Sequence, residues 1–148
     1  MSRQWRNRGG WASAAVLAVA LVVPATDGIS ATTEATVVPA KLVGQWTRKV
    51  TVADVKRTGA TGIPAGSVWT LTIKKSGYAS LSGKGQGPPF TGKIVLAGAN
   101  RVHVNVGVAF PNVYGWRVSG RLLTFTKITE SPALADRAAV IWGVWKRK

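Results

Sequence analysis

The stretch Leu42-Val43-Gly44-Gln45-Trp46 decides the fold, and it begins a run of strand-forming residues over 42–50. β-branched and aromatic residues recur along this run, so it predicts a β-strand. Thr51 and Asp54 follow at the spacing of a capping box, with Asp in place of the usual Glu. Gly59 is suited to end the short helix that such a box begins. The expected order is therefore one strand and then one short helix.

Seven more segments alternate between apolar and polar residues, or are rich in β-branched and aromatic residues. They are 67–75, 78–83, 90–97, 101–108, 113–119, 122–128 and 140–147. In the first of them, Trp69, Leu71 and Ile73 share one face, and threonine and lysine occupy the other. One apolar and one polar face is typical of antiparallel strands with a solvated side.

The connections between these strands are short and contain Gly or Asn, as at Ser76-Gly77, 98–100 and 119–121. Parallel strands need crossovers of a dozen residues or more, so consecutive strands are expected to be antiparallel neighbours. Ser131-Pro132 predicts the start of a second short helix that runs through Arg137. Because open sheet edges must be hidden, the sequence predicts an all-β fold: an eight-stranded antiparallel up-and-down barrel with one or two short helices.

The ordered set of residues at both ends of the barrel segment carries a family resemblance. Its members are Gly44, Trp46, Tyr114-Gly115-Trp116, Gly120, Leu123-Thr124-Phe125-Thr126, Asp136-Arg137 and Trp145-Lys146-Arg147. The set resembles the lipocalin (calycin) superfamily, in particular the lipocalin-like domains of small secreted bacterial proteins, over about 42–148. Such domains often carry a cysteine pair, and this chain has no cysteine.

The resemblance implies that Trp46, next to Gly44, packs across the closed end of the barrel. A cation of the last strand would lie over its indole, with Arg147 as the first candidate and Lys146 as the alternative. The opposing interpretation is that Trp46 is an ordinary core residue and that Arg147 is solvated.

The resemblance also implies an interior that holds a small hydrophobic or amphipathic ligand. The expected ligand-lining residues are Trp69, Leu71, Ile73, Val102, Val104, Tyr114, Trp116 and Phe125. An eight-stranded barrel is also narrow enough for side chains to fill it, so a packed core is the alternative.

Composition argues against an enzyme. The chain has 148 residues, 20 Lys+Arg, five Asp+Glu, one His and no Cys, and its net charge is +15. Cysteine nucleophiles and thiolate metal sites are excluded, and His103 lies on the polar face of its strand without a local partner. We expect no catalytic residues, metal or cofactor, and an ion pair between Asp136 and Arg137.

Residues 1–25 have the features of a secretory signal peptide. Three arginines precede an apolar run at 12–23, and small residues allow cleavage after Ala25 or Ala31. An uncleaved anchor is the alternative, although the run is shorter than the ~20 residues that span a membrane. We therefore expect a protein secreted or held outside the cell envelope, with a flexible leader at 26–41 and the barrel domain at 42–148.

Removal of residues 1–25 leaves 17 Lys+Arg against five Asp+Glu, a net charge of +12. Such a surface attracts polyanions. The alternative function is therefore a barrel with a filled interior that binds anionic lipid or cell-wall polymer. Nucleic acid is not an expected partner for an exported protein, and the sequence indicates no oligomeric state.

Overall fold

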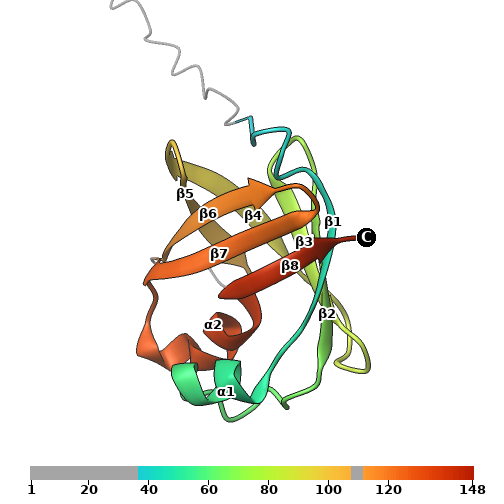
Figure 1. Ribbon diagram of the computed structural model, residues 1–148, viewed down its shortest axis with the longest axis vertical. Coiled ribbons are helices and arrows are strands. Elements are labelled where there is room, and N and C mark those ends of the chain that lie inside the picture. Colours follow the sequence, from blue (N-terminus) through green and yellow to red (C-terminus); the bar gives the residue numbers. More distant parts are fainter. Residues whose placement is uncertain (1–36, 108–111) are drawn as a thin grey trace, which may run out of the picture. The chain divides into compact units, whose positions relative to one another are not determined.

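Eight strands close into a barrel in which every neighbouring pair is antiparallel and the spatial order equals the sequence order (Figure 1). The computed structural model describes residues 37–107 and 112–148. The predicted signal peptide at 1–25, both cleavage sites and most of the predicted leader lie outside these residues. The elements are β1 (Gly44–Lys49), α1 (Val52–Thr58), β2 (Val68–Ile73), β3 (Tyr78–Gly83), β4 (Phe90–Gly98), β5 (Arg101–Val106), β6 (Val113–Ser119), β7 (Leu122–Thr129), the 3₁₀ helix η1 (Pro132–Leu134), α2 (Ala135–Ile141) and β8 (Gly143–Arg147). The predicted fold class is confirmed.

The last predicted strand began three residues too early. Val140 and Ile141 end α2, and β8 starts at Gly143. Both residues are buried because they lie on the helix face that packs into the core. A short apolar run has the same appearance in a buried helix and in a buried strand, so its pattern did not separate the two.

Helix α1 begins as its capping box predicted. Thr51 Oγ1 accepts a hydrogen bond from the Asp54 amide at 3.1 Å, and Asp54 Oδ2 accepts one from the Thr51 amide at 2.8 Å. The helix ends at Gly59, whose φ of 72° is left-handed and therefore favours glycine.

The barrel has two different ends. At the helical end, α1 and α2 pack together below the strands, as Figure 1 shows. The hairpin end is formed by the turns β2–β3, β4–β5 and β6–β7, by the start of β1 and by the end of β8. Figure 1 shows the described chain entering beside this end, and Val38, which the sequence placed in the leader, is buried in the core.

Side chains fill the middle of the barrel. The largest fully buried residues include Trp46, Trp145, Tyr114 and Phe125. Tyr114 and Phe125 contact each other edge to face, with their ring centroids 6.3 Å apart. The interior therefore resembles an ordinary packed core.

The two strands that close the barrel carry the same sequence pattern. Residues 42–49 are LVGQWTRK and residues 141–148 are IWGVWKRK, with Gly, Trp, Arg and the final Lys identical. In each copy the indole N–H donates to the carbonyl four residues earlier: Trp46 to Leu42 at 2.9 Å, and Trp145 to Ile141 at 3.1 Å. Because Thr47 pairs with Lys146 in antiparallel register, a local two-fold axis relates the copies.

Candidate functional site

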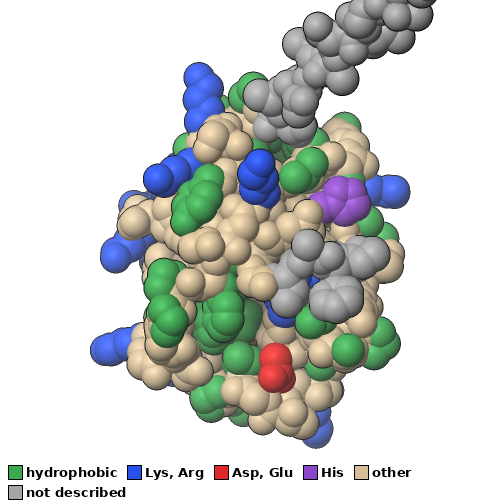
Figure 2. All heavy atoms as spheres, turned by 180° about the vertical axis from the view of Figure 1, so that it is seen from behind, with side chains coloured by type: hydrophobic (Ala, Val, Ile, Leu, Met, Phe, Trp, Pro, Cys, Tyr) green, Lys and Arg blue, Asp and Glu red, His purple; other side chains and the backbone are tan. Residues whose placement is uncertain are grey.

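A pocket of about 340 Å³ opens at the helical end of the barrel. Its lining comes from strands β2 to β5, the α1–β2 connection, η1 and α2: Ile63, Trp69, Leu81, Phe90, Val106, Gly107, Ala133, Leu134, Asp136, Arg137 and Val140. Most of these side chains are apolar. Figure 2 shows hydrophobic side chains around a hollow in the lower half of the face opposite to that of Figure 1.

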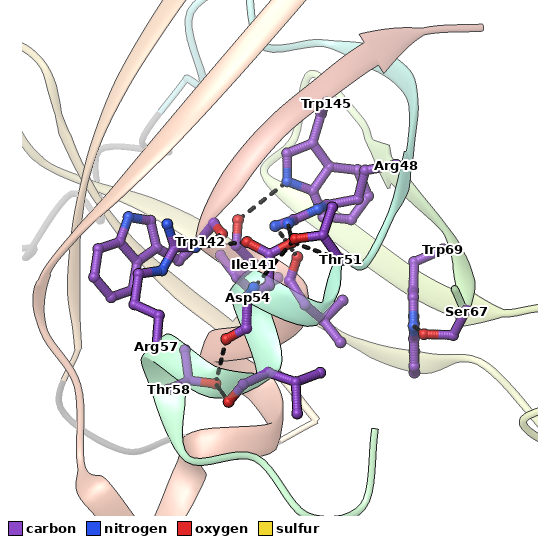
Figure 3. A network of polar contacts seen from close by, with 12 residues as sticks. Arg48, Thr51, Asp54, Arg57, Thr58, Ser67, Trp69, Ile141, Trp142 and Trp145 are labelled. Carbon is purple, nitrogen blue, oxygen red and sulfur yellow. Dashed lines mark hydrogen bonds and ion pairs between the residues drawn. The ribbon is translucent and has the colours of Figure 1, made fainter. Parts of the chain in front are cut away.

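Two aromatic rings make one wall of this pocket. Trp69 points inward from β2 and is nearly buried, whereas Phe90 at the start of β4 is half exposed. Their rings stack with centroids 6.5 Å apart and planes inclined by 22°. The Trp69 indole N–H donates to Ser67 Oγ at 3.0 Å, so its orientation is fixed (Figure 3). A Cβ at Gly107 would lie 3.3 Å from the Phe90 ring, and glycine leaves this room free.

Asp136 ties the α1–β2 connection to helix α2. Its Oδ1 accepts hydrogen bonds from the amides of Thr61 at 2.9 Å and Gly62 at 3.0 Å. These bonds hold the connection that carries Ile63 to the pocket rim. We expected Asp136 to pair with Arg137, and this was wrong. Neighbouring residues on a helix point in different directions, and each of these two has another partner.

The partner of Arg137 is Glu130. Their side chains lie 2.6 Å apart and are only 8% and 1% exposed, and the Tyr114 hydroxyl also donates to Glu130. Burial and the adjacent carboxylate raise the pKa of Tyr114, so the phenol stays protonated and continues to donate. Arg137 therefore brings to the pocket wall a polar group whose charge Glu130 balances.

The structure places the eight predicted ligand-lining residues in three settings. Only Trp69 lines the pocket described above. Six are at most 1% exposed and form the packed core: Leu71, Ile73, Val102, Val104, Tyr114 and Phe125. They do not line this pocket, because alternation shows which side chains point inward and not whether space remains between them. Residues from the rim, η1 and α2 were missed because no periodic pattern marks a pocket edge.

Trp116 lies at a different groove, of about 270 Å³, at the hairpin end. This groove is lined by Lys41, Asn100, Trp116, Arg117 and Val118. The Trp116 indole nitrogen is buried and has no hydrogen-bond partner among the described residues. A buried N–H donor without an acceptor costs free energy, so this position is locally unfavourable in the fold.

The cation expected over Trp46 is Arg147. Its guanidinium carbon lies 4.3 Å from the centre of the Trp46 ring, and its nitrogens donate to the carbonyls of Val43 at 3.2 Å and Lys41 at 3.0 Å. Lys146, the alternative, is exposed. Gly44 leaves room for the guanidinium, since a Cβ there would lie 3.1 Å from it.

A second contact between an arginine and a tryptophan ring was not predicted from the sequence. Arg48 lies 5.8 Å from the centre of the Trp145 ring, forms a 2.6 Å ion pair with Asp54 and donates to the Val140 carbonyl at 2.8 Å (Figure 3). Burial tends to raise the pKa of Asp54, but the hydrogen bonds from Thr51 and the Arg48 charge outweigh burial and lower it. The repeated Gly-x-Trp-x-Arg was the available signal, and two copies about a hundred residues apart do not make a recognisable period.

His103 has a structural partner. Its Nδ1 is hydrogen-bonded to the Asn112 carbonyl, and the Asn112 side chain bonds both backbone groups of Val104. Within 37–107 and 112–148, no three acidic or histidine side chains converge as metal ligands would. None of the helices in these ranges has the length and apolar character needed to cross a membrane.

Comparisons with known proteins show no family for this chain. No family model matches this chain, and no curated protein matches it. One solved structure, the lipoprotein YedD from Klebsiella pneumoniae subsp. pneumoniae MGH 78578, is similar with a TM-score of 0.47 and 13% identity, over 76% of each chain.

Proposed function

We propose that this chain is an exported, non-enzymatic binding protein that holds a small hydrophobic or amphipathic molecule at the helical end of its barrel. The observation that carries the proposal is the pocket of about 340 Å³ with its mainly apolar lining. Ligand sites in proteins have volumes of roughly 300 to 1,000 Å³ and are lined in this way. The space suits a molecule that lies partly in the barrel mouth, because the barrel centre is full.

Burial of apolar ligand surface would supply the affinity, at about 25 cal/mol for each Å² removed from water. Trp69 and Phe90 offer flat faces to an aliphatic chain or a ring. The hydrogen bond that holds the Trp69 ring in place also limits the entropy lost at this side chain when the ligand binds.

The polar part of the pocket favours a ligand with a small polar group. Arg137 and Asp136 stand next to each other in its wall, and both already have partners in the protein. A hydroxyl, amide or carboxyl group of a ligand can share these donors and acceptors without leaving a full charge uncompensated.

The roles of the carboxylates support binding over catalysis. Asp54 pairs with Arg48 and Arg57, Glu130 pairs with Arg137, and Asp136 accepts two backbone amides. A general acid or base must reach its substrate, and these groups are engaged in holding the fold.

The test is binding of the fluorescent probe N-phenyl-1-naphthylamine, with dodecanoic acid and dodecanol as competitors. We expect saturable probe binding that both competitors displace. Ala133→Phe places a ring in the pocket and should weaken probe binding at least tenfold. Ala53→Phe is the matched control, because Ala53 is exposed on α1 outside the pocket. No saturable binding, or equal binding by both variants, would contradict the proposal.

A further inference from the structure

The hairpin end of the barrel carries a dense group of positive charge. Eight exposed cations lie there: Lys41, Lys74, Lys75, Arg101, Arg117, Arg121, Lys146 and Lys148. Every turn at this end contributes at least one, as do the chain entry before β1 and the end of β8. None of the eight pairs with a carboxylate within the described parts of the chain.

The negative charges of the described residues lie at the other end. Asp54 is in α1, Asp136 is in α2, and Glu130 follows the end of β7 beside η1. In Figure 2 the acidic surface lies low on the face, toward the helical end. The remaining two acids of the sequence, Asp27 and Glu34, precede the described residues. The acids of the described residues therefore lie only toward the helical end, where cations such as Lys49, Lys56 and Lys84 are present as well, whereas the exposed charges of the hairpin end are all positive.

The second groove provides a place for an anionic group among these cations. Lys41 and Arg117 flank it, Asn100 adds an amide, and Trp116 forms part of its wall. Two cations and an amide donor suit phosphate oxygens. The groove thus adds a concave feature to this cationic surface.

Exposed apolar side chains accompany the cations. Val37, Tyr78 and Leu122 are large exposed hydrophobic residues at this end. Lysine and arginine surrounding apolar side chains is the composition that suits an interfacial surface of a membrane more than a soluble polyanion. The described chain also enters the barrel at this end, beyond the 25 residues predicted as an export signal or anchor.

We propose that the hairpin end docks onto an anionic phospholipid surface, with a lipid phosphate in the groove between Lys41 and Arg117. Anionic headgroups would satisfy the unpaired cations, and the apolar residues would enter the headgroup layer. This interaction does not depend on the pocket at the opposite end, whose opening would remain turned away from the lipid. Attraction of this kind is expected to weaken as salt rises.

The first experiment is cosedimentation with vesicles of phosphatidylcholine alone or with one quarter phosphatidylglycerol. We expect binding only to the anionic vesicles, reduced at 0.5 M salt. The triple variant Lys41→Gln/Arg117→Gln/Arg121→Gln should bind at least tenfold more weakly. The control Lys49→Gln/Lys56→Gln/Lys84→Gln removes the same charge from exposed positions at the helical end and should lose less than threefold. Thermal unfolding checks that both variants are folded.

Several outcomes would overturn the proposal. Equal losses in the two triple variants would show attraction by net charge without a docking face. Equal binding to neutral vesicles would show that charge is not the cause. Binding to soluble polyphosphate without binding to anionic vesicles would assign the cations to a polymer.

The orientation of the barrel on the vesicle surface can be measured separately, because the chain has no native cysteine to interfere with labelling. Ser119→Cys and Thr129→Cys introduce exposed labelling sites near the two ends of β7. A bimane label at position 119 should shift to the blue on anionic vesicles and be quenched by brominated lipid. The label at position 129 should not change, and a larger response there would reverse the proposed orientation.

Discussion

Arg147 lies directly opposite Trp46 in the β1–β8 register and rests over its indole. The local two-fold axis makes Arg48 the counterpart of Arg147 and Trp145 the counterpart of Trp46. The two contacts differ in their surroundings: Arg147 bonds backbone carbonyls near the surface, whereas Arg48 is buried against Asp54. The seam that closes the barrel therefore has one arginine that lies closer to its ring, Arg147, and one that is buried and ion-paired, Arg48.

Replacement of Arg147 should remove its contact with the Trp46 ring and lower the stability of the fold. Arg147→Gln removes the cation over Trp46 and weakens the bonds to two carbonyls, so we expect a loss of about 1–3 kcal/mol in the free energy of unfolding. Urea denaturation followed by tryptophan fluorescence measures this loss. Lys146→Gln is the control on the outer face and should change stability by less than about 0.5 kcal/mol. Equal effects would show that the stacking contributes nothing.

The glycines that precede each tryptophan should differ in their tolerance of a side chain. Gly143 and Gly44 have φ values of 155° and 140°, and a Cβ would lie 2.5 Å from Arg48 and 3.1 Å from Arg147 respectively. Because Arg48 is held by Asp54, Gly143→Ala should destabilise the fold more than Gly44→Ala. Gly85→Ala is a reference for a glycine with positive φ without a steric neighbour, since its φ is 76° and nothing lies within 4 Å of its Cβ. Thermal melting of the three variants gives the order, and the reverse order would contradict this account.

Loss of the Asp54 charge should be severe. Asp54→Asn leaves the Arg48 cation buried without a counter-charge, which costs about 3–5 kcal/mol. The pKa of Asp54 is lowered in the folded state, so its contribution is present above the unfolded pKa and is lost as pH falls below about 4. The stability gap between wild type and variant should therefore shrink below pH 4. A gap that is constant from pH 7 to pH 3 would contradict an ionic origin.

The contribution of Tyr114 to stability depends on pH in the opposite direction. Its pKa is raised in the folded state, so its contribution is present below the unfolded value of about 10 and decreases as pH rises above it. Tyr114→Phe should cost about 1–2 kcal/mol at pH 7, because Glu130 loses a donor. Urea denaturation at pH 7 and at pH 10.5 should show the smaller gap at the higher pH. A gap that is the same at both pH values would assign the loss to packing, and a gap that widens would contradict a raised pKa in the folded state.

The sequence predicted the barrel well because its strands alternate and its turns are short. Strand 78–83 and strand 113–119 were predicted with the bounds that the structure has. Helix α1 was predicted because a capping box is a local feature. The pocket was not predictable in the same way, because it depends on which inward side chains leave space at one end. In its polar wall, Arg137 of α2 pairs with Glu130, which precedes η1. The sequence suggested Asp136 instead, because it is the neighbour of Arg137 in the chain.

The two strands that complete the barrel are separated by about a hundred residues, since Arg147 bonds Val43 at a sequence distance of 104. Closing so long a loop is slow compared with forming the local hairpins β2–β3, β4–β5 and β6–β7. During synthesis, β1 has no second neighbour until β8 has emerged, and its tryptophan has no cation to cover it. The sheet from β1 to β7 therefore stays open until β8 is available, and closure of the barrel depends on the strand furthest from β1 in sequence.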